Sequence, residues 1–239
     1  MDFESVDVSS NLTGAIMNPK LVLFDIDKTL IDRKHGDTGK FHYTTEKVFG
    51  VRGRRIVTHG MTDQQIIIEM LKKEKIPESV IMPKLEECKN VLADYYRKNM
   101  KNYNYTVFGG VTELLNLLNK NEISLGLVTG NVEEVAHLKL KKVKLDKFFK
   151  VGGFGSDAIR RSDLVRIAMK RAEEEFGSFD DVFVIGDSPG DVQAGKEAGA
   201  KTIGVATGAY SQSTLKKFKP DYVLPNLKST NKILGMIFE

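Results

Sequence analysis

Two aspartates separated by a single residue follow the first short apolar run of the chain. Asp25 and Asp27 come directly after residues 21–24 (LVLF). The first carboxylate of such a pair can attack phosphorus, and the second can protonate a leaving oxygen and then activate water. An aspartate at a strand end is just as commonly a turn former or a helix N-cap. The pair indicates catalysis only if other polar groups lie beside it.

Two further polar clusters follow apolar runs later in the chain. Thr129, Gly130 and Asn131 follow one run, and Asp187 and Asp191 follow another. Thr129 and Asn131 can donate hydrogen bonds to the oxygens of a transferring phosphoryl group. Because ligands bind at the carboxyl ends of strands in a doubly wound sheet, we expect the three clusters to converge at one edge.

The convergence of Asp25, Asp27 and Asp187 predicts a cation. Packed carboxylates repel one another unless a positive charge neutralises them. Mg²⁺ prefers oxygen ligands and commonly takes a few carboxylates together with water and substrate phosphate. The sequence therefore predicts a magnesium-dependent transfer of a phosphoryl group to Asp25.

Apolar runs and amphipathic stretches alternate along most of the chain, which predicts a doubly wound, parallel, Rossmann-like α/β core. The expected strands are residues 21–24, 124–129, 182–185 and 201–205, with a weaker one at 148–151 and an edge strand at 222–224. The expected helices are residues 111–119, 133–143, 162–176 and 190–198. We assign residues 19–32 and 109–239 to this core.

Residues 33–108 interrupt the alternation, because no clear buried strand is predicted there. Residues 63–74 and 80–100 have the spacing of amphipathic helices. We therefore expect an inserted α-helical cap domain over residues 33–108, with its hinge near residues 32–39. Residues 1–18 lack periodicity and are predicted to be a flexible leader.

Three segments resemble motifs of the haloacid dehalogenase superfamily of hydrolases, especially members similar to phosphoglycolate phosphatase that have a small helical cap. Residues 25–29 (DIDKT), 127–131 (LVTGN) and 186–191 (GDSPGD) resemble the first, second and fourth motifs. The resemblance extends over about residues 19–230. It implies a capped site that accepts a small phosphorylated substrate and excludes a folded phosphoprotein.

The resemblance also implies a role for each residue of the motifs. Asp25 would be the nucleophile and Asp27 the general acid and base. Magnesium would be held by Asp25, the backbone carbonyl of Asp27, and Asp187, with Asp191 as a support near the metal. Thr129 would supply a hydroxyl that binds the phosphoryl group.

The third motif of the superfamily is a basic residue, usually a lysine, that is often followed by proline, and the chain departs from it. The corresponding stretch contains no Lys-Pro pair. Arg161, at the start of a predicted helix, fits the position best, and Arg160 is the second choice. Either guanidinium could bind a phosphoryl group through two hydrogen bonds.

The second aspartate of the first motif excludes some of the reactions that the superfamily catalyses. Dehalogenases of the superfamily lack it, and P-type ATPases have threonine there and many transmembrane helices. We therefore expect a phosphatase that hydrolyses small phosphorylated metabolites through an aspartyl-phosphate. A sugar phosphomutase of the β-phosphoglucomutase type shares the same core residues, and a non-catalytic interaction protein on the same fold is a third possibility.

Candidate specificity residues lie in the cap. The candidates are Arg52, Arg54, Arg55, His59 and residues 60–63 (GMTD). For Thr62 and Asp63 we favour a different role, in which one of them caps the helix that follows.

The overall charge gives no sign of a nucleic-acid partner. The 36 basic and 32 acidic residues are interspersed, and their net charge is only +4. The basic cluster of Lys139, Lys141, Lys142 and Lys144 is interpreted as a solvated helix face. No apolar run approaches the ~20 residues that span a bilayer, so no membrane partner is expected.

The single cysteine, Cys88, is predicted to be a packing residue, and it fits a reducing, cytoplasmic setting. A monomer and a homodimer are both compatible with the sequence.

Overall fold

A computed structural model describes residues 19–35 and 39–239 of the chain. Within them, six parallel strands form one sheet in the order β5-β4-β1-β6-β7-β8. The order confirms the predicted parallel α/β core. Its strands are β1 (Lys20–Phe24), β4 (Ser124–Thr129), β5 (Val151–Phe154), β6 (Asp181–Gly186), β7 (Lys201–Val205) and β8 (Tyr222–Leu224).

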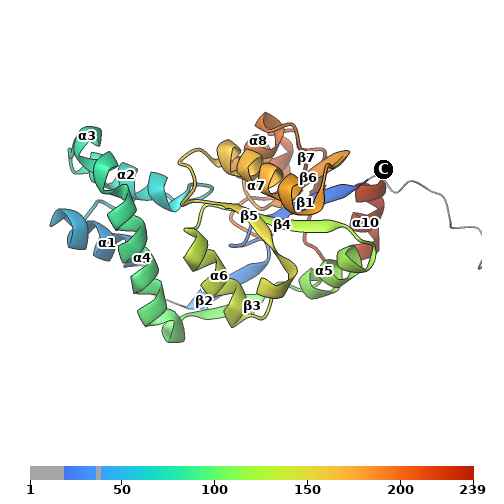
Figure 1. Cartoon of the computed structure of the whole chain (residues 1–239), viewed down its shortest axis with the longest axis horizontal. Coiled ribbons are helices and arrows are strands. Elements are labelled where there is room, and N and C mark those ends of the chain that lie inside the picture. The colour runs from blue at the N-terminus through green and yellow to red at the C-terminus, as the bar shows by residue number, and fades with distance from the viewer. Residues whose placement is uncertain (1–18, 36–38) are drawn as a thin grey trace, which may run out of the picture.

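Helices cover both faces of this sheet (Figure 1). One face carries α5 (Val111–Lys120), α6 (Glu133–Lys142) and α10 (Thr230–Phe238), and the other carries α7 (Arg161–Phe176) and α8 (Pro189–Glu197). A short helix, α9 (Gln212–Lys216), precedes β8. Because both faces are covered, the strands are buried on both sides and are rich in apolar residues.

Strand β1 lies in the middle of the sheet, between β4 and β6. Phe24 pairs with Leu127 on one side and with Ile185 on the other. The strand order reverses at this point, so the loops after the three strands leave the same edge of the sheet. Ligand sites of open α/β sheets are found at this kind of edge.

The inserted residues form a group of helices at one end of the molecule, which we call the cap (Figure 1). It comprises α1 (Lys40–Phe49), α2 (Asp63–Lys73), α3 (Glu78–Ile81) and α4 (Leu85–Asn99). Two antiparallel strands, β2 (Ile31–His35) and β3 (Asn104–Val107), carry the chain between the core and these helices.

The structure corrects three details of the prediction. Residues 33–108 do contain strand structure, because β2 and β3 lie partly or wholly within them; β2 (IDRKH) is too polar to form an apolar run. The helix expected over residues 80–100 is divided at Met82–Lys84, a 3₁₀ turn that contains a proline near its start. Strand β5 begins at Val151 instead of residue 148, because Asp146–Phe148 form another 3₁₀ turn.

The predicted leader at residues 1–18 and residues 36–38 of the predicted hinge lie outside the described residues. Among the described helices, none combines the length and the apolar character required to cross a membrane. Cys88 is buried in α4, as expected of a packing residue.

Candidate active site

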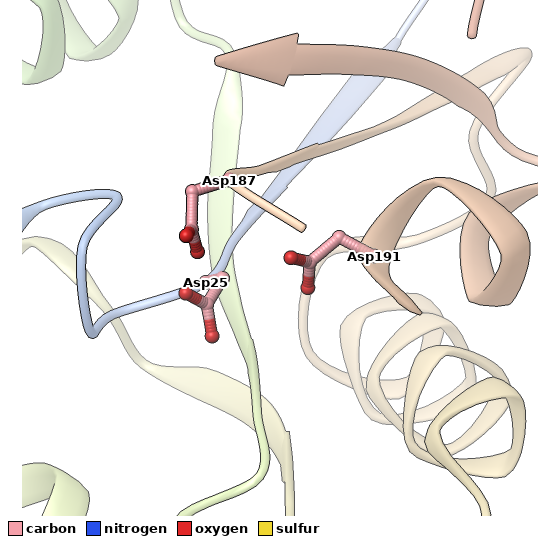
Figure 2. Close-up of side chains that lie close together, drawn as sticks. All are labelled: Asp25, Asp187 and Asp191. Atoms are coloured by element: carbon pink, nitrogen blue, oxygen red, sulfur yellow. The ribbon is translucent and has the colours of Figure 1, made fainter. Parts of the chain in front are cut away.

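Three carboxylates meet at the edge of the sheet where β1 and β6 end. One oxygen from each of Asp25, Asp187 and Asp191 lies within 4.8 Å of the others, and all three side chains are buried. Figure 2 shows the carboxylates pointing toward one another from the ends of two strands and the start of a helix. We call these three residues the acidic trio.

Local structure fixes each member of the trio. The backbone N–H of Asp25 donates to the carbonyl of Ile185 (2.9 Å), which extends the pairing of β1 with β6. Asp191 lies in the first turn of α8, where it forms a capping box with Ser188. A Cβ atom on Gly186 would lie 2.2 Å from Cγ of Asp191, so only glycine leaves space for that carboxylate.

Burial and mutual repulsion raise the pKa of two carboxyl groups in the trio. The pKa of Asp25 is raised first by burial and then by Asp191, and that of Asp187 first by burial and then by Asp25. Such a buried set of oxygen ligands fits a divalent cation, because the cation would remove the repulsion. Asp25 and Asp187 are thus placed as the sequence predicted for a magnesium site.

Arg161 is the positive charge that faces the trio. At the first position of α7, it donates from Nη2 to Oδ1 of Asp25 (2.7 Å) and from Nε to Oδ1 of Asp191 (2.8 Å). Arg160 instead points away, because its side chain is 71% exposed and pairs with Glu197. Of the two arginines considered for the third motif, Arg161 is the one at the site.

The carboxylate of Asp27 is separated from the trio. Its Oδ2 accepts hydrogen bonds from Lys139 (2.6 Å) and from the amide of Asn131 (2.7 Å). Burial opposes ionisation of Asp27, but the positive charges of Lys139 and Lys40 outweigh it and lower its pKa to about 2. Hence the third carboxylate beside Asp25 and Asp187 is that of Asp191, whereas the side chain of Asp27 has its own counterion.

Lys139 is a component of the site that sequence reasoning missed. We expected it on a solvated face of the helix, but its side chain is only 3% exposed and bridges Asp27 and Oδ1 of Asn131 (2.6 Å). Lys141 and Lys142, on the same helix, are exposed as predicted. One signal was available: Lys139 lies one turn from the buried Val135 and Ala136, on the inner face of α6.

The loop after β4 completes the site. Oγ1 of Thr129 accepts a hydrogen bond from the side-chain amide of Asn131 (2.7 Å), and both residues are buried. Gly130 is in close contact with the cap, since a Cβ atom there would lie 2.4 Å from the carbonyl oxygen of Met61. These three residues and Arg161, the four predicted to bind substrate, therefore line the same cavity.

The start of α2 is hydrogen-bonded to the loops of the core. The N–H of Asp63 donates to the carbonyl of Gly130 (2.7 Å), and its Oδ2 accepts from the N–H of Val132 (3.0 Å). The side chain of Gln64 donates to the carbonyl of Gly155 (2.7 Å). Thr62 caps α2, as we favoured, through a hydrogen bond from the N–H of Gln65 (3.1 Å).

A cavity of about 250 Å³ lies between the cap and the ends of the strands. The acidic trio, Asp27, Lys139 and Arg161 line it from the core. Of the specificity candidates in the cap, His59, Gly60, Met61 and Asp63 line it, whereas Arg52, Arg54 and Arg55 are exposed and lie elsewhere.

Magnesium should stabilise the protein, and more strongly at pH 8 than at pH 6. The raised pKa values of Asp25 and Asp187 mean that the metal-free fold loses stability as pH rises and these groups ionise. Magnesium binds the ionised groups, so protons compete with it at the lower pH. At about 100 Kd the gain is about 2.7 kcal/mol, which is measurable as a shift in Tm after EDTA treatment.

Two variants test whether the acidic trio binds magnesium. Asp187→Asn should lose most of the magnesium-dependent shift, and Asp180→Asn, which changes an exposed carboxylate, should keep it. A wild-type Tm that does not respond to magnesium at either pH contradicts the proposed metal site.

Comparison with known proteins places the chain in a family. A family model described as haloacid dehalogenase-like hydrolase matches residues 22–205. Pyrophosphatase PpaX of Halalkalibacterium halodurans is 27% identical over 233 residues, with 92% of this chain and 99% of the relative covered. The matched region includes the acidic trio, Asp27, Lys139 and Arg161.

Solved structures agree on the fold. A predicted phosphoglycolate phosphatase from Haemophilus somnus 129PT has a TM-score of 0.66 at 19% identity, covering 92% of this chain and 99% of its own. A β-phosphoglucomutase from Pyrococcus sp. strain ST 04 has a TM-score of 0.57 at 18% identity, covering 91% and 98%. The family model spans well over half of the chain, and the protein therefore belongs to the haloacid dehalogenase-like hydrolases, as its motifs predicted.

Proposed function

We propose that this hydrolase is a magnesium-dependent phosphatase that acts on small phosphorylated metabolites through a phosphorylated Asp25. The proposal rests on one observation. Two aspartates that are neighbours but one in the chain have side chains in different surroundings. Asp25 faces Asp187, Asp191 and Arg161, whereas Asp27 is held by Lys139 and Asn131. This difference in surroundings supports attack on phosphorus by Asp25 and proton transfer by Asp27.

In the first step, an oxygen of Asp25 forms a bond to phosphorus while the bond from phosphorus to the ester oxygen breaks. Asp27 gives its proton to that oxygen, which leaves as an alcohol. Lys139 and Lys40 outweigh burial and lower the pKa of Asp27 without substrate, so Asp27 must take up a proton as the negatively charged substrate binds and raises this pKa by repulsion.

In the second step, Asp27 removes a proton from water while the water oxygen attacks phosphorus. The bond between phosphorus and Asp25 breaks, and inorganic phosphate is released. Arg161, Thr129 and Asn131 are placed to bind the phosphoryl oxygens during both steps. A bound magnesium ion would supply positive charge that offsets the negative charge of the carboxylates and the phosphoryl group.

The cap supports a small substrate. The contacts of Asp63 and Gln64 with the core bring the cap onto the site, and the cavity of about 250 Å³ is small. A folded phosphoprotein would not fit beneath it, and exclusion of bulk water favours the chemistry of the charged groups. Similarity to proteins named pyrophosphatase and phosphoglycolate phosphatase also favours a small phosphorylated substrate.

Asp25→Asn should abolish phosphate release, with a fall of at least about 10³-fold, because the variant lacks the nucleophile. The measurement is a screen of phosphorylated metabolites with magnesium, with the exposed Asp180→Asn as the control. Equal activity of Asp25→Asn and wild type would overturn the mechanism. Isomerisation of a sugar monophosphate in the presence of its bisphosphate, without phosphate release, would identify a phosphomutase instead.

Lys139→Met should reduce kcat/KM for an alkyl phosphate by about 10²-fold or more, because Asp27 loses the ammonium that holds it in place. The kcat/KM for p-nitrophenyl phosphate should fall much less, since the leaving group of this substrate departs without a proton. Lys141→Met, on the exposed side of the same helix, is the matched control. An equal loss with both substrates would show that Lys139 does not act through proton transfer.

Arg161→Gln should raise KM and lower kcat together, because Arg161 donates directly to the nucleophile and faces the phosphoryl site. We expect a loss in kcat/KM of about 10²-fold or more. The adjacent Arg160→Gln removes an equal charge from the surface and should change kcat/KM by less than about twofold. Similar losses in the two variants would contradict the assignment of Arg161.

A further inference from the structure

The cap-side end of the cavity carries groups that the proposed reaction does not use. Arg33 from β2, Lys40 from α1 and Tyr105 from β3 line it. They come from the two connecting strands and the first cap helix. Two of them are cationic, and the third has a hydroxyl that can donate a hydrogen bond.

The hydroxyl of Tyr105 is buried and has no hydrogen-bond partner among residues 19–35 and 39–239. The residue is only 7% exposed. Buried phenol groups normally find a partner, and leaving one unpaired costs about 1–3 kcal/mol. Because Tyr105 lines the cavity, an acceptor atom of a ligand in the cavity can supply that partner.

The ring of Tyr105 belongs to an aromatic stack that restricts its movement. Its centroid lies 5.9 Å from that of Tyr103, which in turn lies 5.1 Å from that of Tyr96, and both pairs are stacked. Tyr96 comes from α4, so the stack joins the cap helices to the connecting strand. The hydroxyl is therefore held in position before any ligand binds.

The ammonium of Lys40 shares this environment with a second ammonium. Nζ of Lys40 lies 5.0 Å from the centroid of the Tyr96 ring, and Nζ of Lys139 lies 5.5 Å from the same centroid. Burial and then the charge of Lys139 lower the pKa of Lys40 to about 8. The two positive charges therefore destabilise each other, and an anion beside them would offset that cost.

The nearby carboxylates do not form ion pairs with Lys40 in the part of the chain that the structure describes. Asp27 is bonded to Lys139 and Asn131, and Asp63 accepts from the backbone of Val132. Lys40 itself donates to the hydroxyl of Tyr96, which uses one of its three N–H groups. The remaining N–H groups can bind an anion in the cavity.

We propose that the cap-side end of the cavity binds a second anionic group of the substrate, with the Lys40 ammonium as its counter-charge and the Tyr105 hydroxyl as a hydrogen-bond donor. The group is a carboxylate or a second phosphoryl group, since both offer oxygens to these donors. This proposal rests on the proposed function, because it assumes that the first phosphoryl group lies at Asp25. It makes the substrate a small molecule with negative charge at both ends.

Three phosphonates of similar size test this subsite by titration calorimetry on the magnesium-loaded wild-type protein. Ethylphosphonate has one anionic group, phosphonoacetate adds a carboxylate, and methylenediphosphonate adds a second phosphoryl group. At fixed free magnesium, at least one of the two doubly anionic compounds should bind about tenfold or more tightly than ethylphosphonate, as hydrogen bonds to charged groups predict. The preferred compound identifies the second group.

Amino-acid substitutions show which residues cause the tighter binding of the doubly anionic compound. Lys40→Met and Tyr105→Phe should each weaken the preferred compound at least about fivefold more than ethylphosphonate, which uses only the phosphoryl end. Lys47→Met and Tyr43→Phe change exposed residues of α1 and should keep the full preference. Tyr105→Phe removes an unpaired hydroxyl, so its Tm should not fall, and any loss of binding is then a loss of recognition.

The outcomes separate this proposal from the proposed function. Equal affinity for the three phosphonates, or equal losses for all three in Lys40→Met, overturns the second-anion site even if phosphate esters are hydrolysed. A preference that depends on Lys40 without release of phosphate from any ester supports the subsite and overturns the phosphatase. Failure of all three compounds to bind overturns the subsite.

Discussion

Repulsion among three buried carboxylates is the constraint around which the site is built. Asp25, Asp187 and Asp191 approach within 4.8 Å of one another in a buried setting where charge is poorly solvated. The backbone of β1 and β6 and the capping box of α8 hold them together nonetheless. Arg161 offsets part of the charge, and the remaining repulsion favours protonation of the carboxylates or the binding of a cation.

Two counterions from opposite faces of the sheet separate the two aspartates of the first motif. Arg161 reaches Asp25 from α7, and Lys139 reaches Asp27 from α6. These two helices lie on opposite faces of the sheet (Figure 1). Because only one residue lies between the aspartates, their different environments must come from side chains on other elements. The same sheet edge therefore holds one carboxylate among other acids and another beside an ammonium, which is a physical basis for assigning them different chemical tasks.

The cap contributes a second source of selectivity. Its contacts with the core are made by the first residues of α2, so closure of the cap and the shape of the cavity are coupled to the loop after β4. The connecting strands β2 and β3 contribute Arg33 and Tyr105 to the lining of that cavity. Residues of these strands therefore line the cavity, whereas the exposed arginines of the cap do not.

Local signals in the sequence were sufficient for the core of the site. Asp25, Thr129 and Asp187 each follow a buried strand, and strand ends of a parallel sheet must share an edge. The helix cap at Thr62 was also predictable, because capping depends on neighbouring residues only. The motif resemblance then supplied the family, which the comparisons confirm.

Other features required the tertiary structure. Lys139 and Lys141 are two residues apart and equally basic, and only the packing of α6 decides that one is buried against Asp27 while the other faces solvent. Arg161 and Arg160 are distinguished in the same way, by the direction each takes at the start of α7. Lys40 and Tyr105 are 65 residues apart in the chain, and only the folded chain brings both to the lining of one cavity. The sequence by itself determined which polar groups end the strands, since that is a local property; the counterion of each group depends on long-range packing, which only the folded chain decided.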